Sequence, residues 1–268
     1  MRLSLSTPPD VKLMNVTAGS LFLVFTGLVL AALLGWAMRH PVFAIRGITV
    51  QGEVAHTNTV TLRANVMPHL SGSLFTLDLA QARSAFEALP WVRRAVVRRE
   101  FPNRLRVQLQ EQHTAAFWGA QDESLLVNNF GEVFEANVDE VEQDNLPRLV
   151  GPEGQAPQVL QMYRELAPRL GALDTTLDQL ELSASGGWRA TLDSGAVIEL
   201  GSGTPAEVGA RAQRFALTLT QVASRYGRHA DALESADLRY AQGYALRLAG
   251  VSTLAAASSK LSNPKTNR

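Results

Sequence analysis

Cysteine is absent from the 268-residue sequence, and so is a surplus of charge of either sign. Without cysteine there is no disulfide framework, no cysteine-bound zinc or iron–sulfur site and no thiol nucleophile. Lysine and arginine total 25, as do aspartate and glutamate, so the formal net charge is zero. A nucleic-acid binder that works through overall charge needs excess basic residues to neutralise phosphates. Composition therefore argues against a nucleic-acid partner.

One long segment lacks ionisable side chains altogether. Residues 13–38 contain none, whereas a helix needs roughly 20 apolar residues to cross a bilayer. Trp36 stands where an interfacial aromatic anchor is expected. We predict a transmembrane helix over residues 15–38, after a tail of residues 1–14. A cleaved signal peptide is the alternative, but its apolar region usually spans only about 7 to 15 residues and ends at a cleavage site, which is not clear here.

The orientation of this helix is weakly determined by flanking charge. Arg2 and Lys12 precede the helix, whereas Arg39 and Arg46 follow it, so the positive-inside count is close to a tie. The free N-terminal amine favours the inside, and long following domains translocate largely regardless of charge. We expect a single pass with the N-terminus inside and the bulk of the chain outside the membrane.

Residues 43–112 predict a small sheet covered by two helices. Apolar and polar residues alternate around Ile48, two helical segments follow, and two strand-like runs meet at a turn at 101–103. Asp78 precedes the second helix as a capping residue, and Pro90 follows it. The expected order is β-α-α-β-β.

Residues 113–250 predict a β-rich domain, and residues 251–268 a flexible polar tail. Short strand candidates alternate with two amphipathic helices, one of which opens with Thr204-Pro205-Ala206-Glu207, a capping box. Asp193-Ser194-Gly195 is typical of a hairpin turn. We expect an antiparallel sheet with helices on one face, which leaves the other face and one edge available. The fold class is α+β.

Convergent catalytic groups are not found in the sequence. The five histidines are scattered without metal-ligand spacing, and no Gly-x-Ser-x-Gly elbow or P-loop occurs. Carboxylates between 122 and 144 are typical of a solvated loop. We predict a protein that is not an enzyme and has no cofactor, metal or small-molecule substrate.

Several motifs, in this order and spacing, resemble the FtsQ/DivIB family of bacterial cell-division proteins. Those of the first domain, which resemble a POTRA domain, are Leu89-Pro90-Trp91-Val92, Ala95-Val96-Val97-Arg98-Arg99, Phe101-Pro102, Leu105-Arg106-Val107 and Glu111. Those of the second are Ala116-Phe117-Trp118, Val127-Asn128, Gly131-Glu132-Val133-Phe134, Leu146-Pro147, Gly151-Pro152, Gly195, Leu200-Gly201, Arg211, Arg214-Phe215, Asp237-Leu238-Arg239-Tyr240 and Gly243. The resemblance runs from the predicted helix to about residue 250.

This resemblance implies a function. It implies a single-pass type II protein of the inner membrane, with its N-terminus in the cytoplasm and its bulk in the periplasm. Such a protein is expected to act as a divisome scaffold at the septum that binds FtsB, paired with FtsL, and helps to coordinate septal peptidoglycan synthesis. The implied FtsB site comprises Tyr240, Gly243, Gln242, Tyr244 and Leu246, with Tyr240 as the aromatic anchor. Two departures weaken the transfer: Ser185-Gly186-Gly187 lacks an arginine that many relatives have there, and Gln242 replaces a smaller residue.

The residues themselves leave two interpretations of the C-terminal stretch open. Tyr240 and Tyr244 are also typical of ordinary strand aromatics, and Gly243 of a turn. The last strand before the tail is, however, often an edge strand, and an edge accepts a partner strand by β-augmentation.

An arginine group in the predicted hairpin is a possible secondary surface, with Arg98 and Arg99 as its test positions. A soluble strand surface is the ordinary interpretation of such charges. The functional one is a site for a partner or for anionic lipid headgroups, each basic residue adding about 1 kcal/mol.

Two other functional classes remain as alternatives. A POTRA-containing protein of outer-membrane assembly or secretion usually carries a C-terminal barrel, and residues 113–250 are too few and too helical for one. An anchored periplasmic hydrolase lacks its nucleophile, base and metal here.

Overall fold

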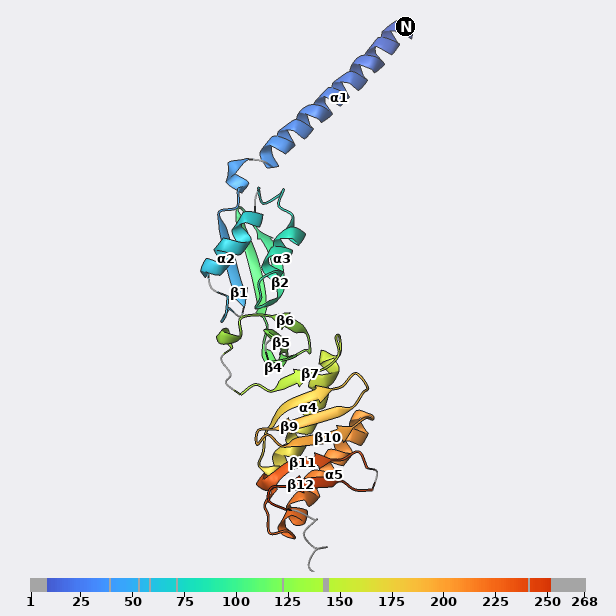
Figure 1. Ribbon diagram of the computed structural model, residues 1–268. Coiled ribbons are helices and arrows are strands. Elements are labelled where there is room, and N and C mark those ends of the chain that lie inside the picture. The colour runs from blue at the N-terminus through green and yellow to red at the C-terminus, as the bar shows by residue number, and fades with distance from the viewer. Residues whose placement is uncertain are drawn as a thin grey trace, which may run out of the picture. The chain divides into compact units, whose positions relative to one another are not determined.

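The computed structural model describes residues 9–38, 40–52, 54–57, 59–70, 72–121, 123–141, 145–240 and 242–251. Residues 1–8 of the expected N-terminal tail and residues 252–268 of the expected C-terminal tail lie outside this set. The chain divides into two compact units, residues 1–111 and residues 112–268. Each unit is described by itself below (Figure 1).

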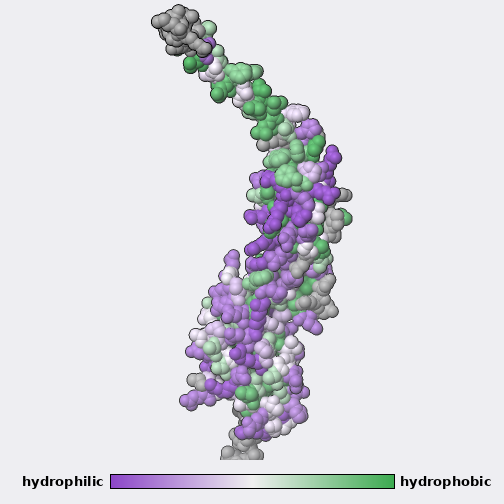
Figure 2. All heavy atoms as spheres, turned by 180° about the vertical axis from the view of Figure 1, so that it is seen from behind, coloured by the Kyte–Doolittle hydropathy of each residue, from purple (hydrophilic) through white to green (hydrophobic). Residues whose placement is uncertain are grey.

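The first helix, α1 (Pro9–Met38), has the properties of a membrane span. Its segment Leu13–Ala37 is apolar, and none of that surface is buried against the protein. Figure 2 shows hydrophobic residues over most of this helix. The hydroxyls of Thr17, Ser20 and Thr26 donate to carbonyls of the preceding turn, so these polar groups are satisfied within the helix. The described part of the helix reaches back to Pro9, ahead of the predicted residue 15, because helical hydrogen bonding is not limited to the hydrocarbon layer.

The rest of the first unit has the predicted β-α-α-β-β order. Its elements are β1 (Gly47–Gly52), α2 (Thr59–Val66), α3 (Leu79–Glu87), β2 (Val92–Glu100) and β3 (Arg104–Glu111), with short 3-10 turns at Pro41–Phe43 and Met67–His69. β3 is central, pairing parallel with β1 and antiparallel with β2. The Asp78 carboxylate accepts hydrogen bonds from the amides of Ala80 and Gln81, which confirms the predicted cap.

The second unit contains one long sheet whose strand order is β12-β11-β10-β9-β8-β7-β4-β5-β6 over the described residues. Its strands are β4 (Thr114–Trp118), β5 (Leu125–Asn128), β6 (Val133–Glu135), β7 (Arg148–Val150), β8 (Leu177–Leu182), β9 (Trp188–Leu192), β10 (Val197–Gly201), β11 (Leu233–Asp237) and β12 (Ala245–Leu248). Its helices are α4 (Ala156–Leu170) and α5 (Pro205–Ser224), with 3-10 turns at Val138–Glu140, Gly171–Leu173 and Ala230–Ala232.

This sheet is mixed, which corrects the expectation of an antiparallel one. β10 pairs parallel with β11, β7 with β8, and β4 with β7, while the other pairings are antiparallel. Two of the parallel steps follow from connections that contain a helix, α5 between β10 and β11 and α4 between β7 and β8. A crossover of that length returns the chain to the same end of the sheet, so the next strand runs parallel.

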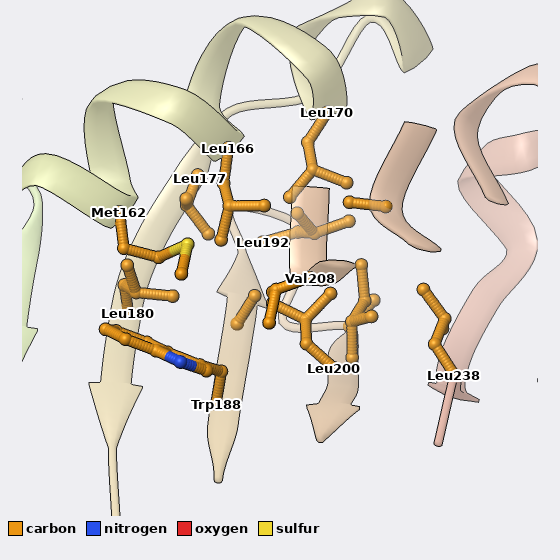
Figure 3. Packing of buried hydrophobic residues seen from close by; sticks show 14 of the residues in the cluster. Met162, Leu166, Leu170, Leu177, Leu180, Trp188, Leu192, Leu200, Val208 and Leu238 are labelled. Atoms are coloured by element: carbon orange, nitrogen blue, oxygen red, sulfur yellow. The ribbon is translucent and has the colours of Figure 1, made fainter. Parts of the chain in front are cut away.

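The core of the second unit lies between the sheet and its two helices. Met162 of α4 lies over Leu180 and Trp188 of the sheet, and Leu166 lies beside Leu177 (Figure 3). The apolar spacing of α4 and α5 predicted from sequence coincides with the buried face of each helix. Burying a side chain of this size contributes roughly 1.5 to 3 kcal/mol, so these layers hold the sheet in one arrangement.

The predicted start of α5 and the predicted hairpin turn are both confirmed. Thr204 accepts from the amide of Glu207, and the Glu207 carboxylate accepts from the amide of Thr204. Between β9 and β10 the amide of Leu192 donates to the carbonyl of Ala196, and Gly195 has a φ of 82°. That left-handed conformation favours glycine.

Candidate partner-binding edge

The strand β12 forms one edge of the nine-stranded sheet. It pairs antiparallel with β11, Ala245 opposite Asp237 and Leu246 opposite Ala236, and it stands at the end of the strand order. Backbone groups of an edge strand point alternately toward the neighbouring strand and away from the sheet. Within the residues that the structure describes, the last predicted strand is therefore an edge strand with no neighbour beyond it, and the three-residue β6 ends the strand order on the other side.

The segment that enters β12 presents Tyr240 to solvent. Leu238 is buried, and its amide donates to the carbonyl of Glu199 at 2.8 Å. Arg239 then turns back, donating from its backbone amide and from its guanidinium to Asp237. Tyr240 follows with 59% of its surface exposed.

Tyr244 has a different environment from Tyr240. Its hydroxyl lies 2.7 Å from that of Thr218 on α5, and its ring meets Phe215 edge-on with centroids 5.2 Å apart. Tyr244 and Leu246 pack against the main core cluster from one side of the strand. The two tyrosines predicted as one binding group thus separate into an exposed ring and a ring that belongs to the fold.

A groove lies beside β12, between the strand and the C-terminal half of α5. Its α5 side is formed by Arg214, Thr218 and Val222, followed by Tyr226 just after the helix. Its strand side is formed by Gln242, Gly243, Tyr244, Leu246, Arg247, Leu248 and Val251. The groove combines apolar side chains with two basic ones, so a partner strand added to β12 has a pocket next to it for a side chain of its own.

The described fold does not require glycine at position 243. Its φ lies outside the left-handed range, and a Cβ added there meets no atom within 4 Å. The turn interpretation of Gly243 is therefore not required by the backbone. An uncovered backbone at this position permits close approach of another chain. Gln242, beside it, is exposed.

The sheet face opposite the helices is polar and internally paired near this edge. A hydrogen bond from Arg239 lowers the pKa of Asp237, and the same carboxylate raises the pKa of the guanidinium. Arg189 contacts Glu199 at 2.7 Å and Glu181 at 3.7 Å. Exposed pairs of this kind contribute little to stability. They instead set the charge pattern of the open face, where Arg239, Ser185 and Gly187 line a common hollow.

Sequence reasoning missed the helical wall of the groove. Arg214, Thr218, Val222 and Tyr226 are spaced four apart, so they form one line beside the buried face of the helix. That spacing was available in the sequence. The position of β12 beside this row of residues could not be predicted from the sequence, because it depends on the crossover connection that contains α5.

The structure does not bring Arg98 and Arg99 onto one surface. Successive residues of a strand point to opposite faces, and Arg99 lies on the helix-covered side, where its guanidinium donates to the carbonyls of Leu74 and Leu77. Arg98 is exposed on the open face and stands opposite Arg106. The predicted arginine surface therefore excludes Arg99, which holds the loop before α3.

The described residues contain no group of three or more histidine, aspartate or glutamate side chains arranged to hold a metal ion. Glu111 is buried, and its carboxylate oxygens accept hydrogen bonds from the backbone amides of Ala55 and Thr57, each at 2.9 Å. His56 stacks on Trp91 with ring centroids 4.1 Å apart. These groups are engaged in holding the first unit together.

Comparison with known proteins identifies both units. Residues 43–112 match the model of the FtsQ-type POTRA domain, and residues 116–239 match that of the C-terminal region of the cell division protein FtsQ/DivIB. The cell division protein FtsQ of Thiomonas arsenitoxydans is 40% identical over 91% of this chain and 89% of its own length. Its namesake in Burkholderia pseudomallei is 37% identical over 90% and 94%, and that of Bordetella pertussis 36% identical over 90% and 92%. The chain belongs to the FtsQ/DivIB family of bacterial cell-division proteins.

Proposed function

We propose that this chain is a non-catalytic scaffold of the divisome that receives FtsB, paired with FtsL, on the outer side of β12. The observation that carries the proposal is the place of β12 at the end of the sheet, with backbone groups turned away from β11. A strand of FtsB added there extends the sheet by main-chain hydrogen bonds, which supply affinity without a preformed pocket.

Specificity in this proposal comes from side chains around the edge. Tyr240 supplies a large aromatic surface at low entropic cost, a property common to interface anchors. Gly243 and Gln242 lie next to the added strand, and Leu246 lines the groove by α5. Tyr244 contributes by holding the edge against α5. Of the two sheet ends, β12 is the one with this groove and an exposed tyrosine beside it.

The membrane arrangement follows from α1. In the proposal residues 1–14 are cytoplasmic, residues 15–38 cross the inner membrane, and the POTRA domain (43–112) and β domain (113–250) lie in the periplasm, followed by a tail of residues 251–268. The chain thereby holds FtsB and FtsL at the septum, where it helps to coordinate septal peptidoglycan synthesis. The exposed apolar surface of Leu13–Ala37 supports the span.

Co-purification of the detergent-solubilised full-length chain with FtsB and FtsL tests this function. We expect a complex that stays together in gel filtration and that is lost when Gly243, just before β12, is replaced or when the side chain of Tyr240 is truncated. Hydrogen exchange on the same complex locates the contact, because amides of β12 that face outward gain protection when a strand is added. A complex in which the β12 amides exchange as in the free chain would contradict the proposed edge.

A further inference from the structure

Three aromatic rings form an exposed cluster at one end of the POTRA domain. The ring centroids of Phe43 and Phe75 are 4.9 Å apart, and those of Phe75 and Phe101 are 5.8 Å apart. Phe101 has 65% of its surface exposed and Phe75 38%, and Val42 beside Phe43 is also exposed. A group of large apolar side chains in contact with one another and with water indicates a contact surface.

Hydrogen bonds join the three separate segments that carry the rings. The amide of Leu74 donates to the carbonyl of Phe43 at 2.8 Å, and the amide of Arg46 donates to the carbonyl of Asn103 at 2.9 Å. Arg99 holds the carbonyls of Leu74 and Leu77. Leu74 is fully buried and packs with Leu105 in a small hydrophobic cluster separate from the main core of the domain. The fold thus supports the rings but does not cover them.

Strand register places this cluster at the end of the domain that the chain enters from α1. Gly47, the first residue of β1, pairs with Arg104, the first residue of β3, so the 101–103 turn lies at the entry end. The chain leaves for the second unit from Glu111, at the other end of β3. Phe43 follows Met38 of α1 by five residues, which span at most roughly 18 Å.

Two arginines lie close in sequence to the rings, Arg46 three residues after Phe43 and Arg104 three residues after Phe101. Arg46 and Arg104 are exposed, and no ion pair to either is formed by acidic residues within the described ranges. The nearby Arg106 is different, since Glu100 pairs with it at 2.5 Å. The stem of Arg104 lies alongside Gly47, with its Cγ 3.8 Å from where a Cβ would stand. Aromatic rings with adjacent unpaired arginines match the headgroup layer of an anionic membrane.

We propose that this end of the POTRA domain rests on the membrane that α1 spans, with Phe75 and Phe101 in the headgroup layer and Arg46 and Arg104 at lipid phosphates. The occupant is a lipid surface because the covalent link to α1 keeps the cluster within reach of one. Such a second contact restricts how the periplasmic part turns about its anchor. The proposal does not depend on which partner binds β12.

Spin labelling of the full-length chain in nanodiscs tests the contact, and the lack of native cysteine makes single labels straightforward. One label is placed by Phe101→Cys and a matched control by Gln110→Cys, which is exposed on the same hairpin, roughly 20 Å along β3. In phosphatidylglycerol nanodiscs we expect the ratio of collisions with oxygen to collisions with a water-soluble nickel chelate to be at least threefold higher at 101 than at 110.

Further variants separate the two parts of the contact. Phe75→Ser in the chain labelled at 101 is expected to lower the ratio to that of position 110. Arg46→Gln with Arg104→Gln, or replacement of the anionic lipid by phosphatidylcholine, is expected to lower it at least twofold. Circular dichroism of each variant checks that the fold is retained. Equal collision ratios at positions 101 and 110, or a ratio at 101 that Phe75→Ser leaves unchanged, would overturn the proposal. A ratio that changes neither with the arginine substitutions nor with the lipid charge would overturn the role of the arginines.

Discussion

The hydroxyl of Tyr244 lies 2.7 Å from the hydroxyl of Thr218, which ties the edge strand β12 to α5. Tyr240, four residues earlier in the chain, has most of its ring in solvent. Two tyrosines that look equivalent in sequence therefore have separable roles, one in stability and one in recognition. This separation makes the proposed FtsB site testable by substitution at each position.

Truncating the exposed ring should impair binding without affecting the fold. We expect Tyr240→Ala to weaken FtsB binding at least about fivefold, since anchor truncation commonly costs over 1 kcal/mol, with an unchanged thermal midpoint. Tyr244→Phe removes only the hydroxyl bonded to Thr218 and should lower stability by about 0.5 to 1.5 kcal/mol. Titration of each variant with FtsB, alongside thermal unfolding, measures both effects. Loss of stability in Tyr240→Ala, or binding equal to that of the unchanged chain, would contradict this assignment.

Gly243 offers a test that separates the fold from the interface. A side chain added at 243 meets open space, and the backbone there does not need glycine. Gly243→Val should therefore leave the unfolding midpoint of the free chain within error. In the complex its branched side chain would obstruct the added strand, and we expect FtsB affinity to fall at least tenfold. Gly154→Val is an unsuitable control because Gly154 has a φ of 78°; Gly171→Val, with open space and no positive φ, is a matched one.

The groove beside β12 should contribute to binding through its α5 wall. Tyr226, just after α5, lines the groove and is 54% exposed, whereas Leu217 of α5 is 72% exposed and does not line it. We expect Tyr226→Ala to weaken FtsB binding about threefold or more, and Leu217→Ala to leave it unchanged. Isothermal titration with both variants decides this. Equal effects of the two substitutions would indicate that the groove remains empty in the complex.

Local structure was largely predictable from sequence because its causes are local. The caps at Asp78 and Thr204 depend on side chains within three residues of the amides they accept from. The 101–103 turn and the hairpin at Gly195 likewise depend on neighbouring residues. The apolar spacing of α4 and α5 was sufficient to identify their buried faces.

Features that depend on distant strands were predicted less well. The parallel pairings of the sheet arise from crossovers that alternation within a strand does not encode. The roles of Arg99 and Tyr244 follow from partners 22 or more residues away. The aromatic cluster joins Phe43, Phe75 and Phe101, which are far apart in sequence and have no common periodicity.

Glu111 should make the POTRA domain sensitive to acid. Burial raises the pKa of this carboxyl group, but hydrogen bonds from Thr57, His56 and Ala55 outweigh burial, so the pKa is lowered from 4.5. A carboxylate whose pKa is lower in the folded state stabilises the fold above its unfolded pKa and loses that contribution as the pH falls through its folded pKa. Protonation removes the charge that the three amides stabilise.

Glu111→Gln isolates this contribution. The amide side chain keeps one oxygen for the amides of residues 55–57 and leaves at least one of them without an acceptor, which should cost about 1 to 3 kcal/mol at neutral pH. We expect amide protection at Ala55 and Thr57, measured by hydrogen exchange on the full-length chain, to fall accordingly at pH 7. The difference from the unchanged chain should shrink as the pH falls from 4.5, the ordinary pKa of this carboxyl group, through the lowered pKa of the folded state, where Glu111 itself becomes protonated. Glu153→Gln, at an exposed carboxylate in the second unit, is the control. A difference in amide protection between Glu111→Gln and the unchanged chain that stays constant down to pH 3 would show that the charge of Glu111 does not carry the effect.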